Sequence, residues 1–197
     1  MIAIRFHGRG GQGGVIASKL LATALFREGW QVQAFSSFGA ERAGAPVAAF
    51  VRADHQRITV HCHIYEPDHV VVLDSALLGT QDITAGLKRS GWILVNSTSA
   101  PEDLHLPRTF SVATCDATGI ALRHGLGTRT SPIVNTAMVG AFVSLTGIVG
   151  LESVVAEIPG VVPIGIETNE AVTRDAFAHV QRLPADTAID TGKPVRA

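Results

Sequence analysis

The sequence predicts an α/β protein, built on a Rossmann-like and mostly parallel sheet that is flanked by helices, with room for a small antiparallel addition. Three observations predict this class. A β-branched run at Ile2–Phe6 leads into a glycine-rich loop and then into a helical pattern. Strand-like and helix-like segments go on alternating along the chain, as in βαβ units. The run VVVLD at Val70–Asp74 is apolar throughout, as expected of a strand buried on both faces.

The first elements form a strand-loop-helix-strand unit. After the glycines, the segment Val15–Glu28 places Ile16, Leu20 and Ala24 on one helical face, and Gly29 is a suitable helix stop. A strand fits Gln31–Phe35. Such a unit favours parallel strands joined by a right-handed crossover.

The remaining elements are assigned by the same patterns. Two short strands at Val47–Arg52 and Ile58–His61 can pair antiparallel. Further strands are predicted at Trp92–Val95 and Phe110–Thr114. Helices are predicted at the following segments: Ser75–Lys88, Asp116–His124, Ser131–Gly150, Leu151–Glu157 and Glu167–Arg182.

The chain is predicted to form a single domain over residues 1–182. No repeat and no linker interrupts it. Residues 183–197 contain few apolar side chains, so we expect a C-terminal tail that is disordered or bound to a partner.

Composition argues against several functional classes. The formal net charge is −1, which gives no broad attraction to nucleic acid or to an anionic membrane. The two cysteines, Cys62 and Cys115, provide neither a disulfide framework nor a set of ligands for an iron–sulfur cluster. The N-terminus lacks the pattern of a secretory signal, and a cytoplasmic protein is expected.

The low charge content suggests that part of the surface is covered by partners. Only 17% of residues are charged, against about 25% in an average soluble domain. At the same time 46% are hydrophobic. We interpret this combination as a first indication of an obligate subunit.

The glycine loop is the first candidate binding site. It matches G-x-G-x-x-G between a strand and a helix, which is the context of a dinucleotide fingerprint. The expected acidic residue at the end of the second strand is missing, because that strand ends in AFSSF. The glycines then serve either close strand–helix packing or contact with an anion or polar cofactor other than NAD. The candidate residues are Gly8, Arg9, Gly10, Gly11, Gln12 and Gly13.

A second candidate is the loop SSFGAERAGAPV at Ser36–Val47. It follows the second strand, so it is expected to meet the glycine loop at one edge of the sheet. The alternative is a solvated surface loop with a local ion pair of little energetic value. Its candidate residues are Ser37, Phe38, Gly39, Glu41, Arg42 and Gly44.

Other candidates are weaker. The motif His61-Cys62-His63 lacks an evident third ligand, so an ordinary strand is favoured over a metal site. Asp74 fits a ligand contact, a turn or a helix cap equally well, and Asn135 fits a ligand contact or a cap. No catalytic motif is present, and no catalytic or metal-binding residue is assigned.

Five motifs in this order resemble the γ subunit of 2-oxoacid:ferredoxin oxidoreductases of the pyruvate/2-ketoisovalerate type, which is also the γ domain of pyruvate:ferredoxin oxidoreductase. The resemblance runs from about Ile2 to about Gln181, nearly the whole chain. One departure is Ala43, where the family often has arginine or glycine. The motifs are GRGGQGGVIASKLLATAL, FSSFGAERAGAPVAAFVR, PDHVVVLDSALL, NTAMVGAF and ETNEAV.

The resemblance implies one subunit of a CoA-acylating 2-oxoacid oxidoreductase rather than a complete enzyme. Thiamine diphosphate, Mg and 4Fe-4S clusters are then expected on partner subunits: a thiamine-binding subunit, a pyrimidine-domain subunit and a ferredoxin-like iron–sulfur subunit. This chain is implied to contact coenzyme A through Gly8–Gly13 and Ser37–Gly44, with Arg9 or Arg42 facing phosphates or a carboxylate.

Several alternatives stay open at this stage. The substrate implied is pyruvate or an aromatic or branched 2-oxoacid such as phenylglyoxylate or indolepyruvate. The acceptor is ferredoxin, or NAD reached through a flavin subunit. The chain is alternatively a structural assembly subunit, or a stand-alone nucleotide-binding module, although the missing acidic residue argues against the last.

Overall fold

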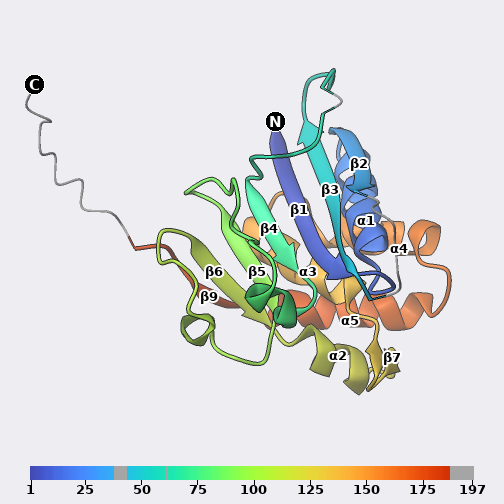
Figure 1. Cartoon of the computed structure of the whole chain (residues 1–197). Helices are drawn as coiled ribbons and strands as arrows, with labels where there is room; N and C mark the ends of the chain where they lie inside the picture. Colours follow the sequence, from blue (N-terminus) through green and yellow to red (C-terminus); the bar gives the residue numbers. More distant parts are fainter. Residues whose placement is uncertain (38–43, 61, 187–197) are drawn as a thin grey trace, which may run out of the picture.

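The computed structural model describes residues 1–37, 44–60 and 62–186 and contains a seven-stranded mixed sheet (Figure 1). The strand order is β2-β3-β1-β4-β5-β6-β9. Strands β3 and β9 run against the other five. The predicted α/β class with a mostly parallel sheet is therefore confirmed. The strands are β1 (Ile2–Arg9), β2 (Gln31–Ser37), β3 (Pro46–Asp54), β4 (His69–Val72), β5 (Trp92–Asn96), β6 (Ser111–Cys115) and β9 (Gln181–Leu183).

The first strands are connected differently from a simple βαβ unit. Strands β1 and β2 are parallel to each other, but β3 lies between them and pairs antiparallel with both. The register is continuous, from Ile2 opposite Ala53 to Arg9 opposite Pro46. Because β3 runs backwards, its first residues lie beside the last residues of β1.

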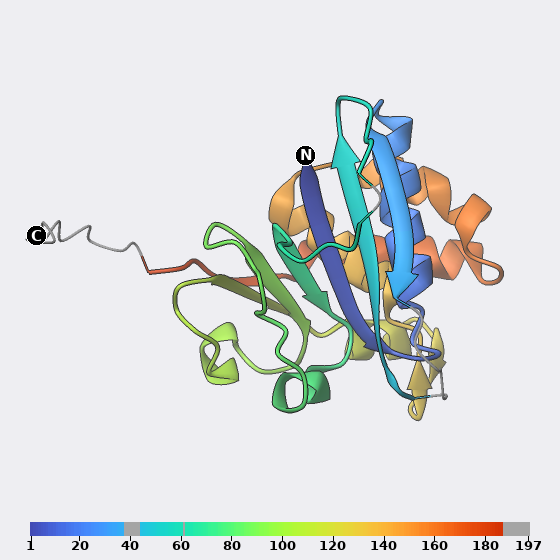
Figure 2. The ribbon, with the colours of Figure 1, turned by 45° about the horizontal axis from the view of Figure 1, so that its top comes forward.

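The long helices lie on one side of the sheet, as Figures 1 and 2 show. The main core lies beneath them and includes Ile4 and Phe6 of β1, Val51 of β3 and Leu94 of β5. Helix α3 is the most deeply buried helix, and α1 and α5 pack against it. The helices are α1 (Gly14–Arg27), α3 (Asn135–Thr146), α4 (Leu151–Val161) and α5 (Ile166–Ala178), with α2 (Ala117–Arg123) at the carboxyl ends of the strands.

The opposite face of β4 and β5 is covered by turns rather than by the predicted helix at Ser75–Lys88. Only a 3₁₀ helix, η1 (Ser75–Gly79), forms there. Asp82 then accepts the N–H of Thr84 in a turn. At Gly86 φ is +70°, and a Cβ would lie 1.9 Å from the carbonyl oxygen of Tyr65. The helix prediction was wrong, because the left-handed backbone at Gly86 is incompatible with a regular right-handed helix.

The predicted strand at Ile58–His61 is also wrong for its described residues, Ile58–Val60, while His61 lies outside the described residues. Arg52 holds this segment against the sheet. Its guanidinium donates to the carbonyl oxygens of Val60 (3.0 Å) and Cys62 (2.9 Å). Strand β3, which contains Val47–Arg52, pairs antiparallel with β1 and β2 instead. A separate two-stranded antiparallel hairpin is formed by β7 (Gly127–Thr128) and β8 (Ser131–Pro132).

The C-terminal end of the described chain returns to the sheet. The last helix ends at Ala178 rather than Arg182, and β9 then pairs with β6. Leu183, the first residue of the expected tail, lies in this strand opposite Val112. Asp186 pairs with Arg108 at 2.6 Å. In the part of the chain that the structure describes, none of the helices has the length and apolarity needed to cross a bilayer.

Candidate functional site

The two candidate loops meet at one edge of the sheet. The N–H of Gly10 donates to the carbonyl oxygen of Ala45 (2.9 Å), and the N–H of Gly44 donates to that of Gly10 (3.3 Å). Ser37 is exposed at the end of β2, opposite Ala48. The expected meeting of the loops is therefore confirmed for their described residues. Four candidates lie outside the described residues: Phe38, Gly39, Glu41 and Arg42.

The glycine loop ends in the free first turn of α1. Gly13 precedes the helix with φ +78°, and its first turn receives no capping bond from a side chain in the described part of the chain. The first helical hydrogen bond is donated by Ala17 to Gly13, so the N–H groups of residues 14–16 have no partner within the helix. Beside them lies a cavity of about 310 Å³. It is lined by Gly8, Arg9, Gly10, Gly11, Gly13, Gly14, Val15, Ile16, Val47 and Ala49.

This arrangement suits a ligand with an anionic group and an apolar part. The N–H groups of this turn, which have no partner among the described residues, and the positive end of the α1 dipole favour a phosphate or carboxylate. The glycines allow the ligand to approach the backbone, while Val15, Ile16 and Val47 provide apolar walls.

Asp74 fastens the glycine loop to the end of β4. One carboxylate oxygen accepts Arg9 Nε (2.7 Å) and Gln12 Nε2 (3.2 Å), and the other accepts the N–H of Ala76 (3.0 Å). Burial raises the pKa of Asp74, but the hydrogen bonds from Arg9, Ala76 and Gln12 outweigh it, so that the pKa is lowered. Arg9 is thus already paired rather than free to meet a ligand.

We expect Asp74→Asn to destabilise the protein by about 2 kcal/mol at pH 7, because hydrogen bonds to a charged carboxylate are lost in a partly buried place. Since the folded-state pKa is lowered, the contribution of the carboxylate is present above the ordinary value of 3.8 and is lost as the pH falls through the folded pKa. Urea unfolding of both proteins at pH 7 and pH 3 measures this. The exposed Asp103→Asn is the control. An equal difference at both pH values would contradict the role of the charge.

A second cavity lies on the other side of the glycine loop, at the carboxyl ends of β1 and β4. The chain leaves β1 toward one face of the sheet and leaves β4 toward the other. Ligands of open α/β sheets commonly bind at such a crevice. Its volume is about 210 Å³. The amide of Asn96 donates to Leu73 and to Thr118, which fixes the ends of β4 and β5 beside it. The lining residues are Gln12, Leu73, Asp74, Ser75, Asn96, Thr118, Pro132 and Val134.

Asn135 lies behind the loop rather than in either cavity. Its side chain is buried, and its Oδ1 accepts the N–H of Thr136 (2.8 Å) in the first turn of α3. A Cβ on Gly13 would lie 2.4 Å from Asn135 Nδ2. Asn135 therefore sets how closely the first turns of α1 and α3 approach each other.

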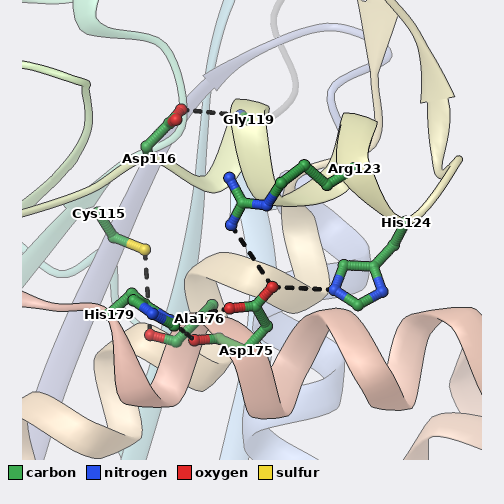
Figure 3. A network of polar contacts seen from close by, with 8 residues as sticks. All are labelled: Cys115, Asp116, Gly119, Arg123, His124, Asp175, Ala176 and His179. Carbon is green, nitrogen blue, oxygen red and sulfur yellow. Dashed lines mark hydrogen bonds and ion pairs between the residues drawn. The ribbon is translucent and has the colours of Figure 1, made fainter.

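A further polar network, which the sequence patterns did not indicate, surrounds Asp175 on α5 (Figure 3). The carboxylate accepts from Arg123 (3.5 Å) and contacts His124 Nε2 (2.9 Å) and His179 Nδ1 (2.8 Å). These contacts connect α2 with α5. Because Arg123 and His124 lie 52 and 51 positions from Asp175 in the sequence, no local motif could have revealed their contacts with it.

The thiol of Cys115 is not activated. Burial, together with the charges of Asp116 and Asp175, raises the pKa of Cys115 to about 12. The thiol therefore stays protonated at neutral pH and is a poor nucleophile. Within residues 1–37, 44–60 and 62–186, no three His, Cys, Asp or Glu side chains come together as a metal site.

The fold and the site define a class: an α/β protein with a glycine loop at the carboxyl ends of its strands, leading into the first turn of a helix. The family model for pyruvate ferredoxin/flavodoxin oxidoreductase matches residues 3–179, and the chain belongs to this family. The resemblance seen in the sequence motifs is therefore confirmed.

Individual relatives agree with this assignment. The chain is 54% identical to pyruvate synthase subunit PorC of Methanocaldococcus jannaschii over 78% of this chain and 82% of that protein. It is 48% identical to the pyruvate/ketoisovalerate oxidoreductases common subunit gamma of Pyrococcus abyssi, over 92% and 98%. The crystal structure of pyruvate oxidoreductase subunit PORC from Thermotoga maritima superposes with a TM-score of 0.78 at 35% identity, covering 92% of this chain and 97% of that one.

Proposed function

We propose that the chain is the γ subunit of a multi-subunit, CoA-acylating 2-oxoacid oxidoreductase. The complex converts a 2-oxoacid, coenzyme A and an oxidised acceptor into an acyl-CoA, CO₂ and a reduced acceptor. Similarity to γ and PorC subunits over most of the chain supports this role. The names of these relatives favour pyruvate as the substrate and ferredoxin as the acceptor.

The role of this chain is to form an edge of the coenzyme A site. The observation that carries this is the free first turn of α1, whose N–H groups border a cavity with apolar walls. These N–H groups suit a coenzyme A phosphate, and the apolar walls suit its aliphatic arm. Thiamine diphosphate, Mg and the 4Fe-4S clusters are placed on partner subunits, where they supply decarboxylation and electron transfer.

Anaerobic co-purification from the native cells tests the assembly. We expect the chain to be recovered with thiamine-binding and cysteine-rich subunits. The complex should reduce an artificial acceptor with one acid from a panel of pyruvate, 2-oxoisovalerate, phenylglyoxylate and indolepyruvate, and only when coenzyme A is present. Recovery of the chain alone, stable and bound to a nucleotide, would contradict the proposal.

An assembly role without coenzyme A contact is a second candidate, because Asp74 already pairs with Arg9. In the complex, Arg42→Gln is expected to raise the KM for coenzyme A about tenfold at similar kcat, as for one charge-assisted hydrogen bond. The exposed Arg27→Gln, at the far end of α1, is the matched control. Loss of assembly with an unchanged KM would favour the assembly role instead.

A further inference from the structure

Among the residues that the structure describes, no strand pairs with the outer side of β2, which forms one edge of the sheet. Strand β2 forms this edge (Figure 2), and its sequence QVQAFSS contains no charged residue and no proline. Its pairing with β3 runs from Gln31 opposite Asp54 to Ser37 opposite Ala48 without a bulge. Proteins usually protect edge strands by charges, proline, bulges or very short strands, because free N–H and C=O groups accept another strand. At the opposite edge, β9 has three residues and carries Arg182.

Two cavities accompany the β2 edge, one on each face of the sheet. On the open face, a cavity of about 560 Å³ is lined by Val32, Gln33, Ala34, Phe35, Arg52 and Cys62. On the helical face, a cavity of about 370 Å³ is lined by Val15, Ser18, Lys19, Ala34, Phe35 and Ser36. Successive side chains of a strand point to opposite faces, so alternate side chains of one added strand can enter both cavities.

Each cavity contains one cationic side chain and no carboxylate among its lining residues. Arg52 is only 3% exposed, and its guanidinium donates to Gln33 Oε1 and to two carbonyl oxygens, all of them neutral acceptors. Lys19 is exposed and forms no ion pair with any residue that the structure describes. Edge-to-edge pairing with a second copy of the chain would bring these cations together. A strand with Asp or Glu side chains is electrostatically complementary to them.

We infer that β2 accepts, as an added strand, an extended segment of a partner subunit that carries carboxylate side chains facing these cavities. The main-chain hydrogen bonds provide affinity, and the two cavities with Arg52 and Lys19 select the segment. This inference rests on the proposed assembly into a multi-subunit complex, but it does not depend on the contact with coenzyme A.

Hydrogen exchange tests the added strand. In the isolated chain, the outward-facing amides of residues 31–37 should exchange rapidly, and in the purified complex at least a hundredfold more slowly. Exchange that is equally fast in an intact complex would overturn the inference. Protection in the isolated chain together with dimer formation would show a second copy as the occupant and would overturn it as well.

Charge reversal at Lys19 tests the chemistry of the segment. Lys19→Glu should raise the Kd for the other subunits about tenfold at 50 mM salt and by less at 300 mM, since salt screens exposed charges. Lys19→Arg, the matched control, should leave the Kd unchanged. A Kd that Lys19→Glu does not change would contradict the acidic partner. Failure of the unmodified chain to bind any other subunit would instead contradict the proposed function, and this inference with it.

Discussion

Gly13→Ala is expected to lower the free energy of unfolding by about 3 kcal/mol. The left-handed conformation at φ +78° costs a residue with a Cβ about 1–2 kcal/mol. The added Cβ would also lie 2.4 Å from Asn135 Nδ2, and forcing an atom into a packed place costs about 1–3 kcal/mol. Because α1 and α3 meet at this point, relief of the clash has to move the first turn of α1.

Gly11→Ala is the matched control, since φ is +95° there but a Cβ would meet nothing within 4 Å. We expect a loss of about 1 kcal/mol from the backbone alone. The double variant Gly13→Ala/Asn135→Ala should be less destabilised than the sum of the two single variants, because the clashing amide is gone. Equal losses for Gly11→Ala and Gly13→Ala in urea unfolding would show that contact with Asn135 is unimportant.

The second large effect that we expect is a fall in the free energy of unfolding as the pH is lowered from 7.5 to 4.5. Burial, with a smaller contribution from the charge of Arg5, lowers the pKa of His7 from 6.5 to about 4. In this window the unfolded chain binds a proton that the folded protein does not, so stability falls with the pH. The difference between the two pKa values corresponds to a loss of about 2.5 kcal/mol by pH 4.5.

His7→Leu should reduce this pH dependence, because Leu does not titrate. The substitution also removes a buried ring nitrogen, Nε2, that has no hydrogen-bond partner among the described residues. Part of the slope should remain, since burial lowers the pKa of His69 in the same direction. The carboxylates with lowered pKa values act only near pH 4 and below. Urea unfolding at several pH values, with the exposed His105→Asn as control, measures the effect. Parallel curves for the unmodified protein and His7→Leu would show that His7 does not stay neutral.

The sequence predicted the sheet and the two site loops because those signals are local. The glycine run after Ile2–Phe6 and the apolar run VVVLD are each contained in a few residues. The order of the strands is not local, since β3 enters between β1 and β2 through pairing between residues up to about fifty positions apart in the chain. The helix predicted at Ser75–Lys88 is absent because the backbone is left-handed at Gly86, where it approaches Tyr65. No periodicity in the sequence reveals this.

In the candidate site, too, local features could be predicted from the sequence and contacts between distant residues could not. The loop glycines could be identified from their spacing, but the pairing of Arg9 with Asp74 joins residues 65 positions apart. The sequence alone therefore indicates that Arg9 is available to a ligand, whereas in the structure its guanidinium is paired with Asp74. The role of Asn135, at the start of α3, likewise depends on its contact with Gly13, at the start of α1.

Hydrogen exchange of the anaerobically purified complex, with and without coenzyme A, tests the contact between the glycine loop and coenzyme A. We expect coenzyme A to slow exchange at the amides of residues 10–16, where the N–H groups of the first turn of α1 have no partner within the helix. Amides of α5, far from that turn in sequence, should not change. Unchanged exchange at residues 10–16 in a complex that turns over with coenzyme A would show that the glycine loop does not contact coenzyme A.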